Sequence, residues 1–399
     1  MTITLRPHQQ RGLDALKQNA IGQVIVPTGG GKTLTMIKDT ERRLDVINNG
    51  TTTVVVAPRI LLAEQLCSEF MEVLDPNNSD PYLHVMHVHS GETDYTSTTK
   101  ADKIHLFASC ARSMGENVII FTTYNSLQRI VEADIEVNTI YFDEAHNSVK
   151  RNFFPATEFF AHEADRCYFY TATRKTSVTI KKPGMNDRHV YGDIIARVSA
   201  PELVEGGYIV APKVKVIKMD TVDRKSITPF LESNNILTSV DELSLNKVLV
   251  CAKTTKQLVT LFQTDFADQL AKRGYSYLYI TSKTGAIIDG KKVTRQQFFD
   301  TLNAWGKDSS KKFVCLHRSI LSEGINVSQL EGVIFMRNMD SIEMTQSIGR
   351  VLRLAENKSF GMVCVPVYSQ VGVSTARALQ TCVDIVFEKG EMYDSVVRR

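Results

Sequence analysis

Short runs of apolar residues recur along the chain, and segments with helical periodicity separate them. Five runs lie in the first half, at 23–26, 53–56, 117–121, 139–142 and 166–170. Five more lie in the second half, at 247–250, 276–280, 312–316, 332–336 and 361–365. Apolar runs without polar alternation are typical of central strands in a parallel sheet that is covered on both faces. The pattern therefore predicts two α/β domains.

The segment between the two series carries paired glycines and two prolines. It reads PELVEGGYIVAP, from Pro201 to Pro212. Such residues interrupt regular structure and mark turns or linkers. We therefore place the domain boundary at Pro212, which gives domains at 1–212 and 213–399.

Composition excludes several classes of protein. The chain has 399 residues, and no stretch of it approaches the roughly 18 to 20 apolar residues of a membrane span. Its first residues lack the apolar core of a signal peptide, so we expect a cytoplasmic protein without membrane contact. The seven cysteines are scattered and indicate neither a zinc site nor a disulfide framework. A net charge of +3 permits a polyanionic partner without arguing for one.

A glycine-rich turn follows the first predicted strand and precedes a helix-like segment. Glycines let backbone N–H groups approach phosphates, a lysine reaches the β and γ oxygens, and a neighbouring hydroxyl ligates Mg²⁺. The strict phosphate-binding pattern has a glycine where Val26 stands, but the strand, turn and helix context is kept. ATP and Mg²⁺ are therefore the predicted cofactors. The predicted phosphate-binding residues are Thr28, Gly29, Gly30, Gly31, Lys32 and Thr33.

An acidic pair follows the fourth apolar run, in the sequence Asp143-Glu144-Ala145-His146. The carboxyl end of a strand is where ligands collect in open α/β sheets. Asp143 is placed to hold Mg²⁺ together with Thr33, partly through water. Glu144 is placed to orient and deprotonate an attacking water.

These motifs, in this order, resemble those of superfamily 2 helicases and translocases of the DEAH/DExH type. The resemblance is greatest to compact phage and viral helicases and to the motor parts of type III restriction enzymes. It implies two tandem RecA-like domains, each a mostly parallel sheet flanked by helices, with ATP bound between them.

The resemblance assigns further roles in the first domain. Gln9, in the segment Leu5 to Gln9, resembles the glutamine that reads the adenine edge. Thr171 and Thr173 resemble the motif that couples hydrolysis to movement, and His146 belongs to the same coupling group.

In the second domain the resemblance implies residues that complete the ATP site. Gly324 would contact the nucleotide, and Gln346, Arg350 and Arg353 would act in catalysis. We expect Arg350 and Arg353 on neighbouring positions of one helical face, from which they would act as arginine fingers on the γ-phosphate.

Nucleic acid is the predicted partner, with DNA favoured over RNA. A motor that moves along any sequence needs contacts mainly to phosphates. The residues expected to make them are Pro58, Arg59, Thr122, Thr123, Thr281, Ser282 and Arg318.

The predicted activity is that of an ATP-dependent DNA helicase or translocase acting by unwinding, branch migration or strand transfer. An RNA helicase or remodeller is the main alternative, and an ATP-gated nucleic-acid-binding subunit is a weaker one. A nuclease is disfavoured because only residues 369–399 lie outside the motor motifs. We find no strand-separating insert, so a protein partner would supply strand separation or targeting.

Overall fold

The computed structural model describes residues 4–46, 50–91, 93–179, 181–281, 284–318, 329–355 and 358–397. They form two compact units. The first unit comprises Met1–Val198 together with Asp394–Arg399, and the second comprises Ser199–Tyr393.

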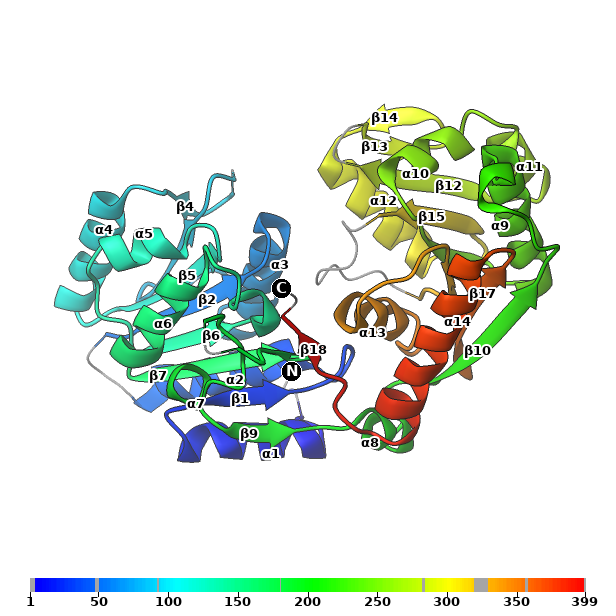
Figure 1. Ribbon diagram of the computed structural model, residues 1–399. Helices are drawn as coiled ribbons and strands as arrows, with labels where there is room; N and C mark the ends of the chain where they lie inside the picture. Colours follow the sequence, from blue (N-terminus) through cyan, green and yellow to red (C-terminus); the bar gives the residue numbers. More distant parts are fainter. Residues whose placement is uncertain are drawn as a thin grey trace. The chain divides into compact units, whose positions relative to one another are not determined.

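The first unit is built on an eight-stranded parallel sheet with the order β4-β3-β5-β2-β6-β7-β1-β9 (Figure 1). Its strands are β1 (Ile21–Ile25), β2 (Thr52–Ala57), β3 (Leu83–Val88), β4 (Thr96–Ser97), β5 (Asn117–Thr123), β6 (Thr139–Phe142), β7 (Arg166–Thr171) and β9 (Ile194–Arg197). The connecting helices are α1 (Pro7–Gln18), α2 (Lys32–Val46), α3 (Ile60–Leu74), α4 (Ala101–Ser113), α5 (Leu127–Glu132), α6 (Phe154–Glu163) and α7 (Arg188–Tyr191).

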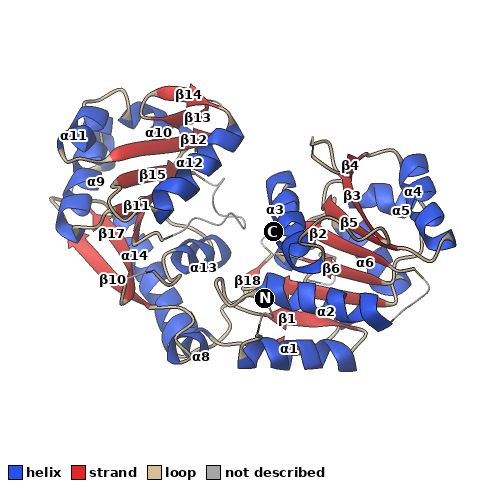
Figure 2. Cartoon of the chain, turned by 180° about the vertical axis from the view of Figure 1, so that it is seen from behind, coloured by secondary structure: helices blue, strands red, loops and turns tan. Residues whose placement is uncertain are grey.

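Helices cover both faces of this sheet, as Figures 1 and 2 show. Phe142 and Phe169 lie on one face and pack with residues of α5 and α6 in a single hydrophobic core. Tyr141 lies on the opposite face, where its hydroxyl contacts α2. Burial on both faces explains why the strand sequences are apolar without alternation.

The second unit has a mixed eight-stranded sheet with the order β10-β17-β16-β11-β15-β12-β13-β14. Its strands are β10 (Ala211–Lys218), β11 (Lys247–Cys251), β12 (Ser276–Thr281), β13 (Gly285–Ile288), β14 (Lys291–Val293), β15 (Phe313–His317), β16 (Gly332–Phe335) and β17 (Phe360–Val367). Its helices are α8 (Ala200–Glu205), α9 (Pro229–Leu243), α10 (Thr255–Leu261), α11 (Phe266–Lys272), α12 (Arg295–Lys307), α13 (Ser341–Arg350) and α14 (Gln370–Cys382). Only the β12–β13 and β13–β14 pairs are antiparallel. The predicted fold class, two mostly parallel α/β domains of the RecA-like type, is therefore confirmed.

The boundary between the units differs from the prediction at Pro212. Pro212 lies inside β10, an edge strand of the second sheet, where a residue without an N–H group is tolerated. The preceding residues also belong to the second unit, because the Val210 N–H donates to the Leu352 carbonyl (2.8 Å). The division therefore falls between Val198 and Ser199.

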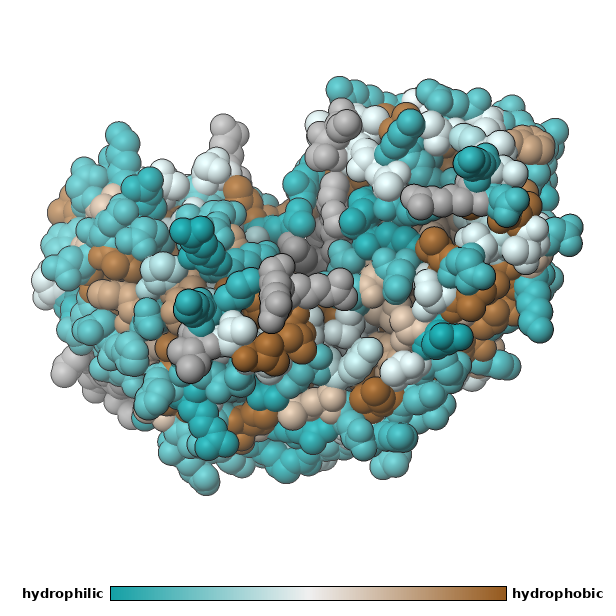
Figure 3. Space-filling view, viewed as in Figure 1, coloured by the Kyte–Doolittle hydropathy of each residue, from teal (hydrophilic) through white to brown (hydrophobic). Residues whose placement is uncertain are grey.

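None of the helices in the described part of the chain combines the length and apolarity that a membrane span requires. On the face shown in Figure 3, hydrophilic residues predominate and hydrophobic residues gather in small separate patches.

The end of the chain returns to the first unit. The strand β18 (Ser395–Val396) pairs in parallel with β8 (Lys175–Thr176). The Ser395 N–H donates to the Arg174 carbonyl (2.9 Å), and the guanidinium of Arg174 pairs with the Asp394 carboxylate. We call residues 394–397 the C-terminal strap. It lies against the residues that directly follow the predicted coupling motif.

We expect Arg174→Ala to loosen the C-terminal strap, because it removes the partly buried ion pair with Asp394. The amide protons of Ser395 and Val397 should exchange with solvent about fivefold faster, the effect of losing about 1 kcal/mol. Hydrogen exchange measured by NMR or mass spectrometry checks this. Arg129→Ala, which removes an exposed ion pair with Glu132, is the control. Equal exchange rates in the wild type and Arg174→Ala would contradict the role of the ion pair.

Candidate nucleotide site

The turn between β1 and α2 has the backbone of a phosphate cradle. Gly29 and Gly31 have φ values of 87° and 78°, in the left-handed region that favours glycine. The Gly30 N–H donates to the Pro27 carbonyl (3.0 Å), which closes the turn, and Lys32 begins α2. Three consecutive glycines therefore lead directly into the N-terminus of α2. This arrangement binds phosphates because the backbone N–H groups can approach them closely.

The first helix, α1, holds this turn in place. The Gln9 amide donates to the Gly31 carbonyl (3.3 Å), and Nε2 of His8 donates to the Gly30 carbonyl (2.8 Å). The Arg6 N–H in turn donates to Oε1 of Gln9 (2.9 Å), as part of a capping box at the start of α1. A Cβ atom at Gly31 would lie 2.2 Å from Nε2 of Gln9, so the Gln9 amide would have to move, and the φ of 78° favours glycine independently. Sequence reasoning found Gln9 but missed His8.

A cavity of about 210 Å³ adjoins the turn. Residues of α1, β1, α2 and the end of β9 line it, among them Gln9, Gly30, Thr35 and Arg197. Gln9, the predicted adenine contact, therefore stands on the wall of a cavity as well as against the turn.

Asp143 and Glu144 extend β6 at its carboxyl end, as predicted. The Asp143 N–H donates to the Val56 carbonyl (2.9 Å), and its own carbonyl accepts from the Tyr124 hydroxyl (2.9 Å). Glu144 has a φ of 46°, an uncommon conformation for a residue other than glycine. Its carboxylate lies 3.9 Å from the Lys32 ammonium, and both side chains are nearly buried. The structure thus brings together Lys32 and Glu144 from two separate elements.

The charges of Asp143, Glu144 and Lys32 fit a divalent cation bound beside the two carboxylates. Burial, and to a smaller extent the neighbouring charge of Glu144, raise the pKa of Asp143 to about 7 against the opposing effect of Lys32. Two buried carboxylates face one lysine, so an additional positive charge would favour their ionised forms. Thr28 lies in the turn that precedes Lys32. Its hydroxyl is buried and has no hydrogen-bond partner among the described residues. The donors for Mg²⁺ and for phosphate oxygens are therefore present, with Thr33 in the first turn of α2.

The predicted coupling residues form a continuous buried chain with Glu144. His146 lies in a short 3-10 helix at Ala145–Asn147, and its Nδ1 is 3.5 Å from the Glu144 carboxylate. The same nitrogen is 3.1 Å from the Thr171 hydroxyl, which donates to the Thr173 carbonyl (2.9 Å). Contacts therefore lead from Lys32 through Glu144 and His146 to the end of β7.

The residues of the first unit that we expect to contact nucleic acid lie at the carboxyl ends of two neighbouring parallel strands. Pro58 and Arg59 follow β2, and Thr122 and Thr123 end β5, its neighbour. Both threonines are buried. The Thr122 hydroxyl donates to the Val88 carbonyl (2.9 Å), and that of Thr123 lies 3.4 Å from the Ser126 hydroxyl.

In the second unit, Thr281 ends β12, and Arg318 follows β15, the parallel neighbour of β12. Thr281 is buried, and its hydroxyl lies 2.6 Å from that of Thr284. Arg318 is partly exposed, and its guanidinium lies 3.8 Å from the Glu343 carboxylate. Ser282 and Gly324 lie outside the described residues.

The expectation that Arg350 and Arg353 share one helical face is wrong. Gln346 and Arg350 are buried on α13, which ends at Arg350. The chain then turns, because the Val351 N–H donates to the Ile348 carbonyl (2.9 Å), and Arg353 forms a bridge with Ile209. Residues 352–353 pair through their backbone with residues 209–210, and the helix therefore ends before Arg353.

Sequence reasoning also missed Arg337, which follows β16. Its guanidinium pairs with Glu343 of α13 (2.9 Å) and donates to the Arg318 carbonyl (3.0 Å). The signal for it was an arginine placed directly after an apolar strand, shortly before the helix with Arg350.

Two family models match the chain. Residues 2–175 match the type III restriction enzyme, res subunit, and residues 232–355 match the helicase conserved C-terminal domain. No curated protein sequence matches it significantly.

Solved structures share its fold over almost its whole length. The type ISP restriction-modification enzyme LlaBIII bound to DNA superposes with a TM-score of 0.74 and 17% identity, covering 99% of this chain and 31% of LlaBIII. A nuclease-deletion mutant of LlaGI with a DNA substrate mimic gives 0.67 and 19%, covering 95% of this chain and 28% of LlaGI. A variant of Dbp5 from S. cerevisiae bound to RNA and ADP BeF3 gives 0.62 and 14%, covering 98% and 89%.

The chain thus spans less than a third of the length of the type ISP enzymes and most of the length of Dbp5. The two family matches and the paired α/β sheets together identify it as a superfamily 2 helicase core that resembles the motor domains of type III restriction enzymes.

Proposed function

We propose that this protein is a nucleic-acid-stimulated ATPase that moves along or remodels DNA. The observation that carries the proposal is the buried chain of contacts from Lys32 through Glu144 and His146 to Thr171. It joins a phosphate cradle, a candidate catalytic base and the segment assigned to coupling. Charged and polar groups that are buried together beside a phosphate cradle are characteristic of functional sites.

The residues of the first unit divide the work of hydrolysis. The Lys32 ammonium and the backbone N–H groups of residues 29–33 neutralise and orient the phosphates. The Thr33 hydroxyl and the Asp143 carboxylate would hold Mg²⁺, which when bound would supply further charge neutralisation at the phosphates. Glu144 accepts a proton from the attacking water. His146 contacts both Glu144 and Thr171, so it can relay a change at the γ-phosphate to β7.

The second unit supplies the remaining groups in this proposal. Gln346, Arg350 and Arg353, with Gly324, complete the site when the two units act together. A planar guanidinium suits the γ-phosphate because it presents paired donors and stays charged. Arg337 holds Glu343 at the start of α13, the helix that carries Gln346 and Arg350.

DNA is the proposed substrate because the match over residues 2–175 is to a restriction-enzyme subunit. The type ISP enzymes with the same fold were solved with DNA or a DNA mimic. The contacts to phosphates would come from Pro58, Arg59, Ser282 and Arg318. Thr122, Thr123 and Thr281 are buried and would support the strand ends that carry these residues. RNA is the alternative, since the Dbp5 structure was solved with RNA. A protein partner would supply strand separation or targeting.

Two substitutions test the ATP site. Lys32→Ala should abolish ATP binding and turnover. Glu144→Gln should keep ATP binding but slow hydrolysis by roughly two to four orders of magnitude, the usual contribution of a general base. Steady-state ATPase rates and equilibrium binding of a fluorescent ATP analogue measure both effects.

Lys38→Ala on the same helix and Glu136→Gln on the surface of the same unit are the matched controls. Both should retain wild-type turnover. Near-normal hydrolysis by Glu144→Gln would exclude the proposed site.

A second test concerns the arginines. Arg353→Ala should slow ATP hydrolysis roughly a thousandfold, as expected for the loss of an arginine finger. Arg350→Lys keeps the charge but not the planar donors, so its rate should also fall. Single-turnover hydrolysis at saturating ATP separates this effect from binding.

Arg273→Ala, which removes an exposed ion pair with Asp241 in the same unit, is the control and should be neutral. Wild-type rates in both Arg350→Lys and Arg353→Ala would show that the second unit takes no part in hydrolysis.

The third test identifies the nucleic acid. Single-stranded or duplex DNA should stimulate ATPase activity, and the stimulation should weaken steeply as salt rises, because phosphate contacts release counterions. ATPase rates with single-stranded DNA, duplex DNA, forked DNA and RNA, each at several salt concentrations, decide the question. Stimulation by RNA with no response to DNA would select the RNA alternative.

A further inference from the structure

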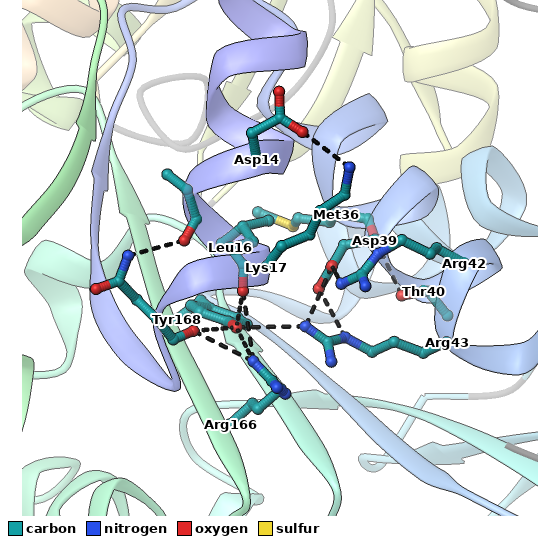
Figure 4. A network of polar contacts seen from close by, with 12 residues as sticks. Asp14, Leu16, Lys17, Met36, Asp39, Thr40, Arg42, Arg43, Arg166 and Tyr168 are labelled. Carbon is teal, nitrogen blue, oxygen red and sulfur yellow. Dashed lines mark hydrogen bonds and ion pairs between the residues drawn. The ribbon is translucent and has the colours of Figure 1, made fainter. Parts of the chain in front are cut away.

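A buried polar network lies on the face of the first sheet that α2 covers (Figure 4). Its centre is Asp39 of α2, whose side chain is wholly inaccessible to solvent. The carboxylate accepts from the Tyr141 hydroxyl (2.6 Å), from Nη2 of Arg42 (2.7 Å) and from Nε of Arg43 (2.9 Å). An ionised carboxylate in such a position needs these donors, because burial without them is costly.

The network continues to the neighbouring strand. Tyr168 on β7 is the register partner of Tyr141 on β6, and their rings stack with centroids 5.8 Å apart. Arg43 donates to the Tyr168 hydroxyl (3.3 Å). That hydroxyl is 2.8 Å from the Leu16 carbonyl and 2.7 Å from the Asn19 carbonyl, both at the end of α1.

Four elements therefore meet at the network, and each carries a candidate nucleotide-site residue further along. Helix α1 carries Gln9, α2 begins with Lys32, β6 leads into Asp143, and β7 ends in Thr171. Tyr141 stands only two residues before Asp143. A displacement of α2 along the sheet would move Lys32 relative to Asp143 and Glu144, and the network opposes that displacement.

We propose that Asp39 and Tyr141 are positioning residues for ATP hydrolysis. They hold the helix that begins with Lys32 in register with the strand that leads into Asp143 and Glu144. This inference rests on the proposed ATPase function. Buried hydrogen-bonded charges of this kind fix one geometry more than they add stability, since a hydrophobic replacement of the whole set can be equally stable.

The same face of the sheet offers a control. Tyr170 lies two residues after Tyr168, and its ring is 6.2 Å from that of Tyr141. Its hydroxyl is also buried, but it has no hydrogen-bond partner among the described residues. Tyr170→Phe and Tyr141→Phe therefore remove the same atom from neighbouring sites, and only Tyr141→Phe breaks the link to α2.

The experiment compares Tyr141→Phe, Asp39→Asn and Tyr170→Phe in the full chain. Tyr141→Phe should lower kcat for ATP about tenfold with KM within about twofold, because a small misplacement near the reacting groups costs rate before binding. Asp39→Asn, which also removes the charge facing Arg42 and Arg43, should lower kcat roughly a hundredfold. Tyr170→Phe should match the wild type in both constants.

Equal kcat values for Tyr141→Phe and Tyr170→Phe, with both proteins folded by circular dichroism and thermal melting, would overturn the inference. An increase in KM alone would also overturn it. If Asp39→Asn fails to fold, the comparison of the two phenylalanine variants still decides. Unchanged turnover in Lys32→Ala would instead contradict the proposed function itself.

Discussion

The first unit depends on one electrostatic constraint, the burial of two adjacent carboxylates beside a single lysine. Burial and the neighbouring charge of Glu144 raise the pKa of Asp143 to about 7, and the Lys32 ammonium opposes this rise. The sheet order meets this need, since β7 alone separates β6 from β1, the strand that leads to Lys32. Thr171 ends β7, and it contacts residues on both sides: its hydroxyl is 3.1 Å from His146, and its carbonyl accepts from the Val26 N–H (3.0 Å).

Much of this arrangement could be predicted from the sequence. The ten apolar runs correspond to central strands, because a strand buried on both faces has an unmistakably apolar sequence. The residues of the nucleotide site could be predicted because they come directly after strands. Residues that follow parallel strands gather at the carboxyl end of the sheet. The predicted roles of Lys32, Glu144, His146 and Thr171 led to residues that the structure brings into one contact chain.

Other features depend on tertiary contacts that no local pattern encodes. The apolar runs did not include β9 and β10, which lie at sheet edges and have partly exposed residues. The end of α13 was also misplaced, because pairing of Leu352 with Val210 competes with the helix. The network around Asp39 could not be predicted for the same reason, because it joins residues such as Asp39 and Tyr141, which are 102 positions apart in the sequence.

The C-terminal strap has a consequence for how the molecule is assembled. With residues 394–397 in the first unit, the second unit is topologically an insertion, and the chain passes between the units twice. Strand β8 cannot gain its partner until the second unit has been synthesised, so the segment after Thr173 is completed last. Folding of the two units is thus coupled in time.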